Sequence, residues 1–159
     1  MKSLCKFVLW SAVLFWMAVI FFLSAQPAHD SSALSGQLIR SIIAFFQPDF
    51  FDLSKAQQAK IIASYQNLVR KFAHGLVYMV LGMLTMAALI PHSARARKKV
   101  IIALFLCAAY AVTDEFHQLF VGGRSGEIRD VVVDVCGAAA GIGFVLAAKT
   151  VFFHKGGNS

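Results

Sequence analysis

The sequence predicts an all-α polytopic membrane protein with four transmembrane helices and an extracytoplasmic amphipathic helical segment between the first two. Two observations support this prediction. The chain of 159 residues is 58% hydrophobic and only 14% charged, which is too apolar for an ordinary soluble domain. Its apolar residues also gather into four stretches that can cross about 30 Å of hydrocarbon, a distance that takes about 20 helical residues. Helices are expected because each span must pair its own backbone groups.

The predicted spans lie within a single domain of residues 1–159 and cover residues 7–23, 72–90, 100–121 and 130–153. The first span follows Lys2 and Lys6, as in a signal peptide. However, its apolar run exceeds the usual h-region of about 7–15 residues, and Leu23 stands where a cleavage site needs a small side chain. We therefore expect residues 1–25 to be retained as a helix.

Basic residues in short flanks and loops indicate the orientation, because they remain on the cytoplasmic side. Eight of them share one side with no acidic residue among them: Lys2, Lys6, Arg95, Arg97, Lys98, Lys99, Lys149 and Lys155. All eight acidic residues map to the other side. Both termini and the loop 91–99 are therefore predicted to be cytoplasmic, and residues 24–69 to be extracytoplasmic.

The predicted outer segment contains two helical patterns. Residues 31–46 carry Leu34, Leu38 and Ile42 at helical spacing, which suits a short helix on the membrane surface. Residues 54–57 have the form of a capping box, with Ser54 followed three residues later by Gln57. No Gly or Pro follows before Gly75, so we expect this helix to continue into the second span.

Charge and cysteine content exclude two other classes of protein. The net charge of +7 does not indicate nucleic-acid binding, because the basic residues are scattered between apolar runs rather than gathered in one solvated patch. The three cysteines lie inside apolar stretches, with neither a disulfide framework nor zinc-site spacing. We interpret them as packing residues.

Ionisable side chains near the ends of three predicted spans indicate a site, since each costs about 2.5–3.5 kcal/mol at mid-membrane. Helical periodicity places them on three narrow stripes. These are Asn67, Arg70, Lys71, His74 and Tyr78; Tyr110, Asp114, His117 and Gln118, with Glu115 at the edge; and Asp130 and Asp134. The last stripe continues into Gly137 and Gly141, a small-residue surface where a second helix can approach closely. The topology brings all three stripes together in the outer third of the bilayer.

A glycine-rich connection lies between the third and fourth spans, at residues 122–126. It carries Arg124 and Ser125 just before a helix begins, a position that suits a phosphate or carboxylate. We therefore predict binding of a polar or anionic ligand, with Arg70 and Arg124 holding the anion and Asp130 and Glu115 orienting them. The predicted ligand-binding residues are Arg70, Lys71, Tyr78, Gln118, Arg124, Ser125, Asp130 and Asp134.

Two further readings of this polar cluster stay open. Acid–base chemistry needs paired groups whose proton affinities differ, and the candidates for such catalytic roles are His74, Asp114, Glu115 and His117. The same charges can instead form a neutralising ion-pair lattice that locks the helices together. Glu127 and Arg129 are interpreted as solvated loop charges. No metal or cofactor is predicted, because residues 114–117 lack the i, i+4 histidine pair of the zinc protease motif and no nucleotide fingerprint is present.

Several motifs together resemble the VanZ-like family over essentially the whole chain. They are Ser24-x-Gln26-Pro27, Arg70-Lys71-x-x-His74-x-x-x-Tyr78, Asp114-Glu115-x-His117-Gln118, Gly123-Arg124-Ser125 and Asp130-x-x-x-Asp134-x-x-Gly137. One departure is Val77, because many relatives have an acidic residue just before the tyrosine. If that acidic residue contributes to a site in those relatives, this chain lacks the contribution or uses Glu115 instead.

The resemblance implies a bacterial cell-envelope protein of a family named after a protein that confers resistance to the antibiotic teicoplanin. The expected ligand at the outer leaflet is a wall-precursor lipid, a phospholipid head group or a lipoglycopeptide. The alternatives are a membrane-embedded hydrolase or transferase acting on an envelope lipid, and a structural partner of another envelope protein. No nucleic-acid partner is expected.

Overall fold

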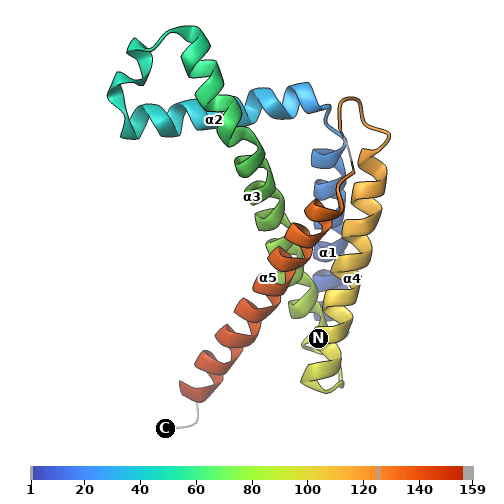
Figure 1. Ribbon diagram of the computed structural model, residues 1–159. Helices are drawn as coiled ribbons and strands as arrows, with labels where there is room; N and C mark the ends of the chain where they lie inside the picture. Colours follow the sequence, from blue (N-terminus) through green and yellow to red (C-terminus); the bar gives the residue numbers. More distant parts are fainter. Residues whose placement is uncertain (1, 125, 156–159) are drawn as a thin grey trace.

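The computed structural model describes residues 2–124 and 126–155, without the side chains of residues 2, 28–32, 34 and 152–155. Five α-helices and one 3-10 helix follow one another along the chain (Figure 1). They are α1 (Lys2–Ser24), α2 (Ala28–Phe46), η1 (Pro48–Asp52), α3 (Lys55–Leu89), α4 (Ala96–Gln118) and α5 (Ile128–Lys155). Because the described residues contain no strand, the predicted all-α class is confirmed.

Four of these helices, α1, α3, α4 and α5, are long and apolar enough to cross a membrane, which confirms the predicted spans. Their bounds differ modestly from those predicted. The connection between α3 and α4 is shorter than the predicted loop 91–99, because α4 already begins at Ala96. The basic residues that follow Ala96 are good helix formers, so they extend the helix beyond its apolar part.

The continuation of the second capped helix into the membrane is also confirmed. Ser54 caps α3 by accepting a hydrogen bond from the Gln57 backbone N–H, and the Gln57 side chain accepts one from the Ser54 N–H. The helix then runs for 35 residues without interruption. At a rise of about 1.5 Å per residue this is roughly 52 Å, well beyond the hydrocarbon thickness, so its first turns extend past the other spans. Figure 1 shows α2 lying across the same end of the molecule.

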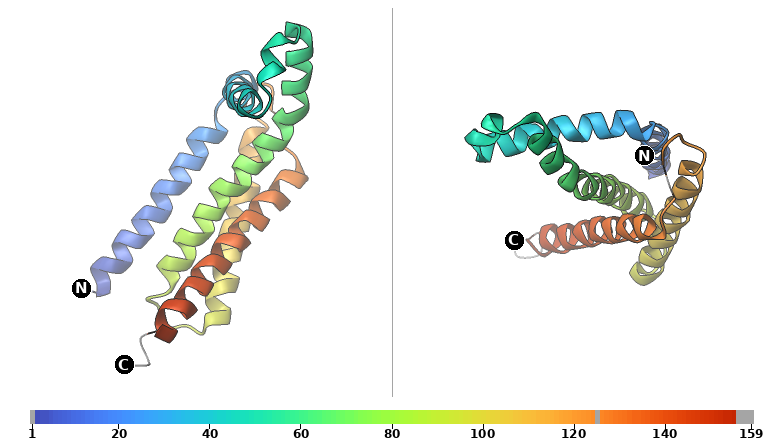
Figure 2. Two further views of the ribbon diagram at one scale, coloured as in Figure 1. Left: turned by 90° about the vertical axis from the view of Figure 1, so that its left-hand side faces the viewer. Right: turned by 45° about the horizontal axis from the view of Figure 1, so that its top comes forward.

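One end of the bundle carries basic residues alone, whereas the other carries all the acidic residues together with further basic ones. The start of α1, the end of α5 and the turn from α3 to α4 lie at one end, whereas α2, η1 and the connection from α4 to α5 lie at the other (Figures 1 and 2). At the first end, Lys99 is buried and donates a hydrogen bond of 2.7 Å to the carbonyl oxygen of Ile90, which caps the C-terminus of α3. The assignment of this end to the cytoplasm stays a prediction.

The closest packing in the bundle is between α3 and α5, whose crossing has no room for side chains. A Cβ atom added at Gly137 would lie 2.1 Å from the carbonyl oxygen of Gly75, and one added at Gly141 would lie 2.0 Å from that of Met79. The two backbones are therefore in direct contact, as the small-residue stripe on α5 predicts. On the other side of α3, α1 is held by a hydrogen bond of 2.9 Å from Trp16 Nε1 to the Val77 carbonyl oxygen.

We predict that Gly137→Ala destabilises the protein by about 1–3 kcal/mol, the usual cost of overpacking. The added methyl group would force α3 and α5 apart. The matched control is Gly143→Ala, because a Cβ atom at this second α5 position meets nothing within 4 Å. Thermal unfolding of both variants in one detergent provides the measurement. Equal melting temperatures for the two variants would contradict the backbone contact.

Candidate functional site

Polar side chains from every spanning helix converge at the end of the bundle where α2 lies. Helix α1 contributes Ser24 from its last turn, and α3 contributes the face that carries His74 and Tyr78. The last turns of α4 and the first turns of α5 contribute the acidic residues. The three sequence-predicted stripes therefore meet at one level, as expected from the periodicity of the helices.

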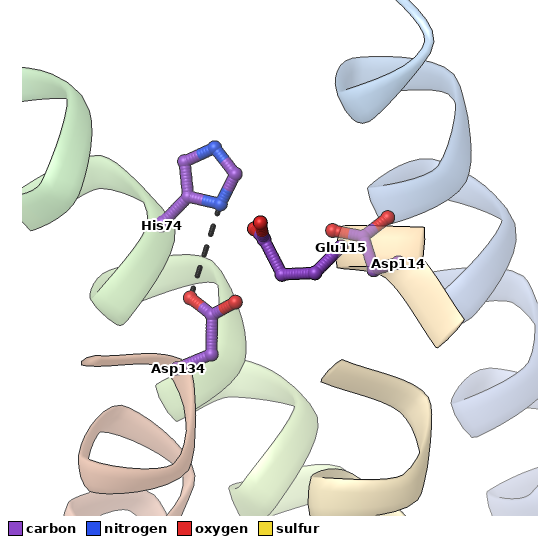
Figure 3. Close-up of side chains that lie close together, drawn as sticks. All are labelled: His74, Asp114, Glu115 and Asp134. Atoms are coloured by element: carbon purple, nitrogen blue, oxygen red, sulfur yellow. Dashed lines mark ion pairs between the residues drawn. The ribbon is translucent and has the colours of Figure 1, made fainter. Parts of the chain in front are cut away.

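Three carboxylates and one histidine form the centre of this site (Figure 3). Asp114, Glu115 and Asp134 are buried, with exposed fractions of 3%, 6% and 0%. One ligand-type atom from each of these residues and from His74 lies within 4.8 Å of the others. His74 Nδ1 is 3.8 Å from Asp134 Oδ1. We call these four residues the carboxylate centre.

Hydrogen bonds from neighbouring groups orient two of the three carboxylates. Ser24 Oγ donates to Asp114 Oδ2 at 2.8 Å, and the Glu127 backbone N–H donates to Glu115 Oε2 at 2.9 Å. Gln118 Nε2 donates to both acids, at 3.4 Å to Asp114 Oδ2 and 3.2 Å to Glu115 Oε1. In contrast, Asp114 Oδ1, the Tyr78 hydroxyl and both oxygens of Asp134 are buried without a hydrogen-bond partner. The unused acceptors therefore gather at the middle of the centre.

A separate ion-pair group lies at the rim. Lys71 Nζ is 2.6 Å from Asp130 Oδ1 and 3.3 Å from Glu127 Oε2. Lys71 thus contacts carboxylates, and Asp130 contacts this lysine rather than the two arginines that it is predicted to orient. Glu127, interpreted as a solvated loop charge, lies just before α5 with a side chain that is 42% exposed, and it also pairs with Lys71. For this part of the polar cluster, the contacts are those expected of a neutralising ion-pair lattice.

A pocket of about 270 Å³ opens beside the carboxylate centre, between α1, α2, α3 and the connection from α4 to α5. Most of its wall is apolar, and its polar residues come from five different segments. The lining consists of Ile20, Leu23, Ser24, Gln26, Ser35, Leu38, Val69, Arg70, Ala73, His74, Val77, Tyr78 and Arg124. His74 belongs both to this wall and to the carboxylate centre. The pocket therefore combines apolar surface with cationic and titratable groups.

Two arginines give the pocket its positive charge. Arg124 Nε donates to the Gln26 carbonyl oxygen at 2.9 Å and Nη1 to Gln118 Oε1 at 3.3 Å. Arg70 Nη2 donates weakly to Asn67 Oδ1 at 3.4 Å. Within the part of the chain that the structure describes, no carboxylate lies within ion-pair distance of either guanidinium. Burial, and then the like charge of Arg70, lower the pKa of Arg124, so a bound anion would relieve an unfavourable arrangement.

One predicted site residue lies elsewhere in the structure. His117 stacks on Phe21 of α1, with a distance of 4.4 Å between ring centroids, and does not belong to the carboxylate centre. Its i+3 spacing from Asp114 puts both residues on one broad face, but the ring turns toward α1. Ser125 lies outside the described residues. Arg129 is exposed, as its interpretation as a solvated charge implies.

Two residues of the site were not predicted from chemistry. Ser24 is buried against Asp114, and Gln26 supplies the carbonyl oxygen that binds Arg124. Neither belongs to a stripe, since both lie at or just beyond the end of the first span. Their only signal was the motif Ser24-x-Gln26-Pro27, which entered through the family resemblance.

Comparison with known protein families matches residues 9–151 to the family described as VanZ/LLP1. The chain belongs to the VanZ-like family. The match includes all of α3 and α4, most of α1 and α5, and every residue of the carboxylate centre and the pocket, so the whole site lies within the family domain. No curated protein and no solved structure matches the chain. This VanZ-like protein is therefore interpreted from its own geometry.

We predict that Ser24→Ala lowers the stability of this VanZ-like protein by about 1–2 kcal/mol, in the upper range for hydrogen bonds between membrane helices. The change removes a buried bond to a carboxylate that ties α1 to α4. Ser64→Ala is the matched control, because Ser64 is exposed and its Oγ donates to the Ile61 carbonyl oxygen of its own helix. Thermal unfolding in detergent measures both. An unchanged melting temperature for Ser24→Ala would show that this bond does not hold the helices together.

Proposed function

We propose that this VanZ-like membrane protein binds the anionic head group of an envelope amphiphile in the pocket formed by α1, α2 and α3. The observation that carries the proposal is the pair of arginines in its wall, neither of which has a carboxylate partner among the described residues. A guanidinium recognises phosphate or carboxylate through two parallel hydrogen bonds. Such contacts are stronger in a low-dielectric surrounding than in water.

The remaining walls favour an amphiphile over a free anion. Ile20 and Leu23 of α1, Leu38 of α2, and Val69 and Val77 of α3 supply apolar surface beside the arginines. A ligand with a charged head and an acyl chain would pair with both kinds of surface. A small hydrophilic anion would leave the apolar part unused.

The charge separation along the bundle supports an extracytoplasmic pocket. With the basic end in the cytoplasm, the pocket faces the outer leaflet and both termini face the cytoplasm. The candidate ligands are then a wall-precursor lipid, a phospholipid head group or a lipoglycopeptide. Teicoplanin combines a polar head with a lipid tail, so a role in antibiotic resistance follows if binding at this site lowers its access to wall precursors.

The binding proposal is tested with Arg70→Gln and Arg124→Gln, which remove charge but keep hydrogen-bond donors. Each is expected to weaken binding of a short-chain phosphatidylglycerol about 10- to 100-fold, because a hydrogen bond between charged groups contributes about 1.5–3 kcal/mol. Isothermal titration in a zwitterionic detergent gives the affinities. Phosphatidylcholine serves as the neutral-headed comparison ligand.

The matched control variant is Arg40→Gln, since Arg40 is an exposed arginine of α2 outside the pocket. It should bind phosphatidylglycerol as the wild type does. Equal affinity for phosphatidylglycerol in the wild type and all three variants would contradict the proposal. The same set, expressed in a teicoplanin-susceptible bacterium, tests the resistance link: only the pocket variants should change the inhibitory concentration.

A membrane-embedded hydrolase or transferase is the second candidate, favoured by the His74–Asp134 pair beside Glu115. A carboxylate next to an imidazole can orient it as a general base. If the protein turns over its lipid, His74→Ala should abolish product formation from labelled envelope lipids. His92→Ala, at the opposite end of the bundle, should not. Saturable binding without product in the wild type would exclude this candidate.

A third reading, a structural partner of another envelope protein, predicts a different pattern. Substitutions on exposed helix surfaces, such as Phe105 of α4 and Phe144 of α5, would then remove the cellular phenotype. Variants of the pocket would keep the wild-type effect on teicoplanin susceptibility.

A further inference from the structure

We propose that the carboxylate centre, His74, Asp114, Glu115 and Asp134, is a binding site for one divalent transition-metal ion, Zn²⁺ or Mn²⁺. This inference goes beyond the head-group proposal and does not depend on it. The sequence alone does not favour a metal, because the four residues come from three helices and show no ligand spacing. Only their convergence in space indicates the site (Figure 3).

The spacing of the four ligand atoms fits a single ion. Bonds from zinc to carboxylate oxygen or imidazole nitrogen are about 2.0–2.2 Å long, so two ligand atoms of a tetrahedral ion are roughly 3.4 Å apart, and two on opposite sides of an octahedral ion at most roughly 4.4 Å apart. The four atoms lie within 4.8 Å of one another. Side-chain rotations that shorten the longest of these separations by about 1 Å would therefore bring all four into coordination distance.

The surroundings of Asp134 also indicate a bound cation. Its side chain is completely buried, and neither of its oxygens has a hydrogen-bond partner. Figure 3 shows its carboxylate directed toward His74 and the Glu115 carboxylate. A buried carboxylate without donors is unfavourable unless a proton or a cation neutralises it. Asp114 Oδ1 is a second buried oxygen without a partner.

No side-chain cation of the described chain neutralises this centre. Lys71 binds Asp130 and Glu127, and Arg124 donates to the oxygens of Gln26 and Gln118. Among the side chains that the structure describes, no lysine or arginine lies within ion-pair distance of the three carboxylates. A divalent ion would neutralise most of their charge.

The surrounding hydrogen bonds resemble those that orient metal ligands. Ser24 binds one oxygen of Asp114 and leaves the other without a partner. Gln118 and the Glu127 backbone N–H each occupy one lone pair of the Glu115 oxygens, and each oxygen retains another. Such outer contacts fix the direction of ligating carboxylates. A mixed set of imidazole and carboxylate ligands suits Zn²⁺ or Mn²⁺.

The test uses full-length protein purified in detergent without chelators. Elemental analysis should find about one zinc or manganese per chain. After removal of metal with EDTA, titration with Zn²⁺ should give a single site. Asp134→Asn keeps the shape of the side chain and should weaken Zn²⁺ binding at least tenfold. Asp52→Asn, at an exposed carboxylate of η1 outside the centre, should bind Zn²⁺ as the wild type does.

A second variant and a second readout separate binding from folding. The His74 side chain is 20% exposed, so His74→Gln is expected to be tolerated even if Asp134→Asn is not. With Mn²⁺ bound, pulsed electron paramagnetic resonance should detect coupling to an imidazole nitrogen in the wild type and lose it in His74→Gln. Zn²⁺ should raise the melting temperature of the wild type and not that of Asp134→Asn.

Absence of metal from the wild type, together with no Zn²⁺-dependent rise in its melting temperature, would overturn the inference. Asp134 would then be a protonated acid, and Asp134→Asn would be at least as stable as the wild type. Unchanged Zn²⁺ binding in both variants would overturn it equally. Arg124→Gln separates this result from the head-group proposal, because it should weaken phosphatidylglycerol binding and leave Zn²⁺ binding unchanged.

Discussion

The direct backbone contact between α3 and α5 is the constraint on which the rest of the site depends. Gly137 packs on the backbone of Gly75, and the chemistry lies immediately beside this contact. His74 precedes Gly75, and Asp134 is one turn before Gly137. This backbone contact lets a short aspartate on α5 and an imidazole on α3 lie 3.8 Å apart. Larger residues at the crossing would push the two helices apart. His74 and Asp134 would then be too far apart to interact, although neither had been replaced.

The charges around this crossing are divided into three groups with different partners. At the rim, Lys71 neutralises Asp130 and Glu127, which makes that group self-sufficient. Among the described side chains, the three buried carboxylates have no lysine or arginine partner, and the two arginines of the pocket have no carboxylate partner. Gln118 lies between the latter groups, donating to Asp114 and Glu115 and accepting from Arg124. The Gln118 amide is neutral, so it connects the carboxylates to Arg124 without neutralising either charge. Each group therefore keeps its capacity for an external ligand.

The sequence was sufficient for the arrangement of helices and for the residues that face inward. Apolar length defined the spans, the capping box at Ser54 marked the start of α3, and the small-residue stripe below Asp134 indicated the close crossing. The sequence did not determine which side chains of the polar cluster contact one another. Helical periodicity states which face a residue occupies, not which rotamer it adopts, so it could not show that His117 turns to Phe21 or that Lys71 binds Asp130. Those outcomes depend on how the connection from α4 to α5 returns to the bundle.

Ser24 and Gln26 illustrate a related limit of periodicity. They lie where α1 ends, and a helix terminus carries no repeating pattern that would mark a functional face. Their roles depend on the neighbouring elements: Asp114 of α4 approaches Ser24, and the connection after α4 brings Arg124 to the Gln26 carbonyl. The turn from α1 into α2 thus binds both the carboxylate centre and the cationic wall. Since α2 also supplies Leu38 to the pocket, movement of this surface helix would change the ligand's surroundings and the hydrogen bonds of the centre together.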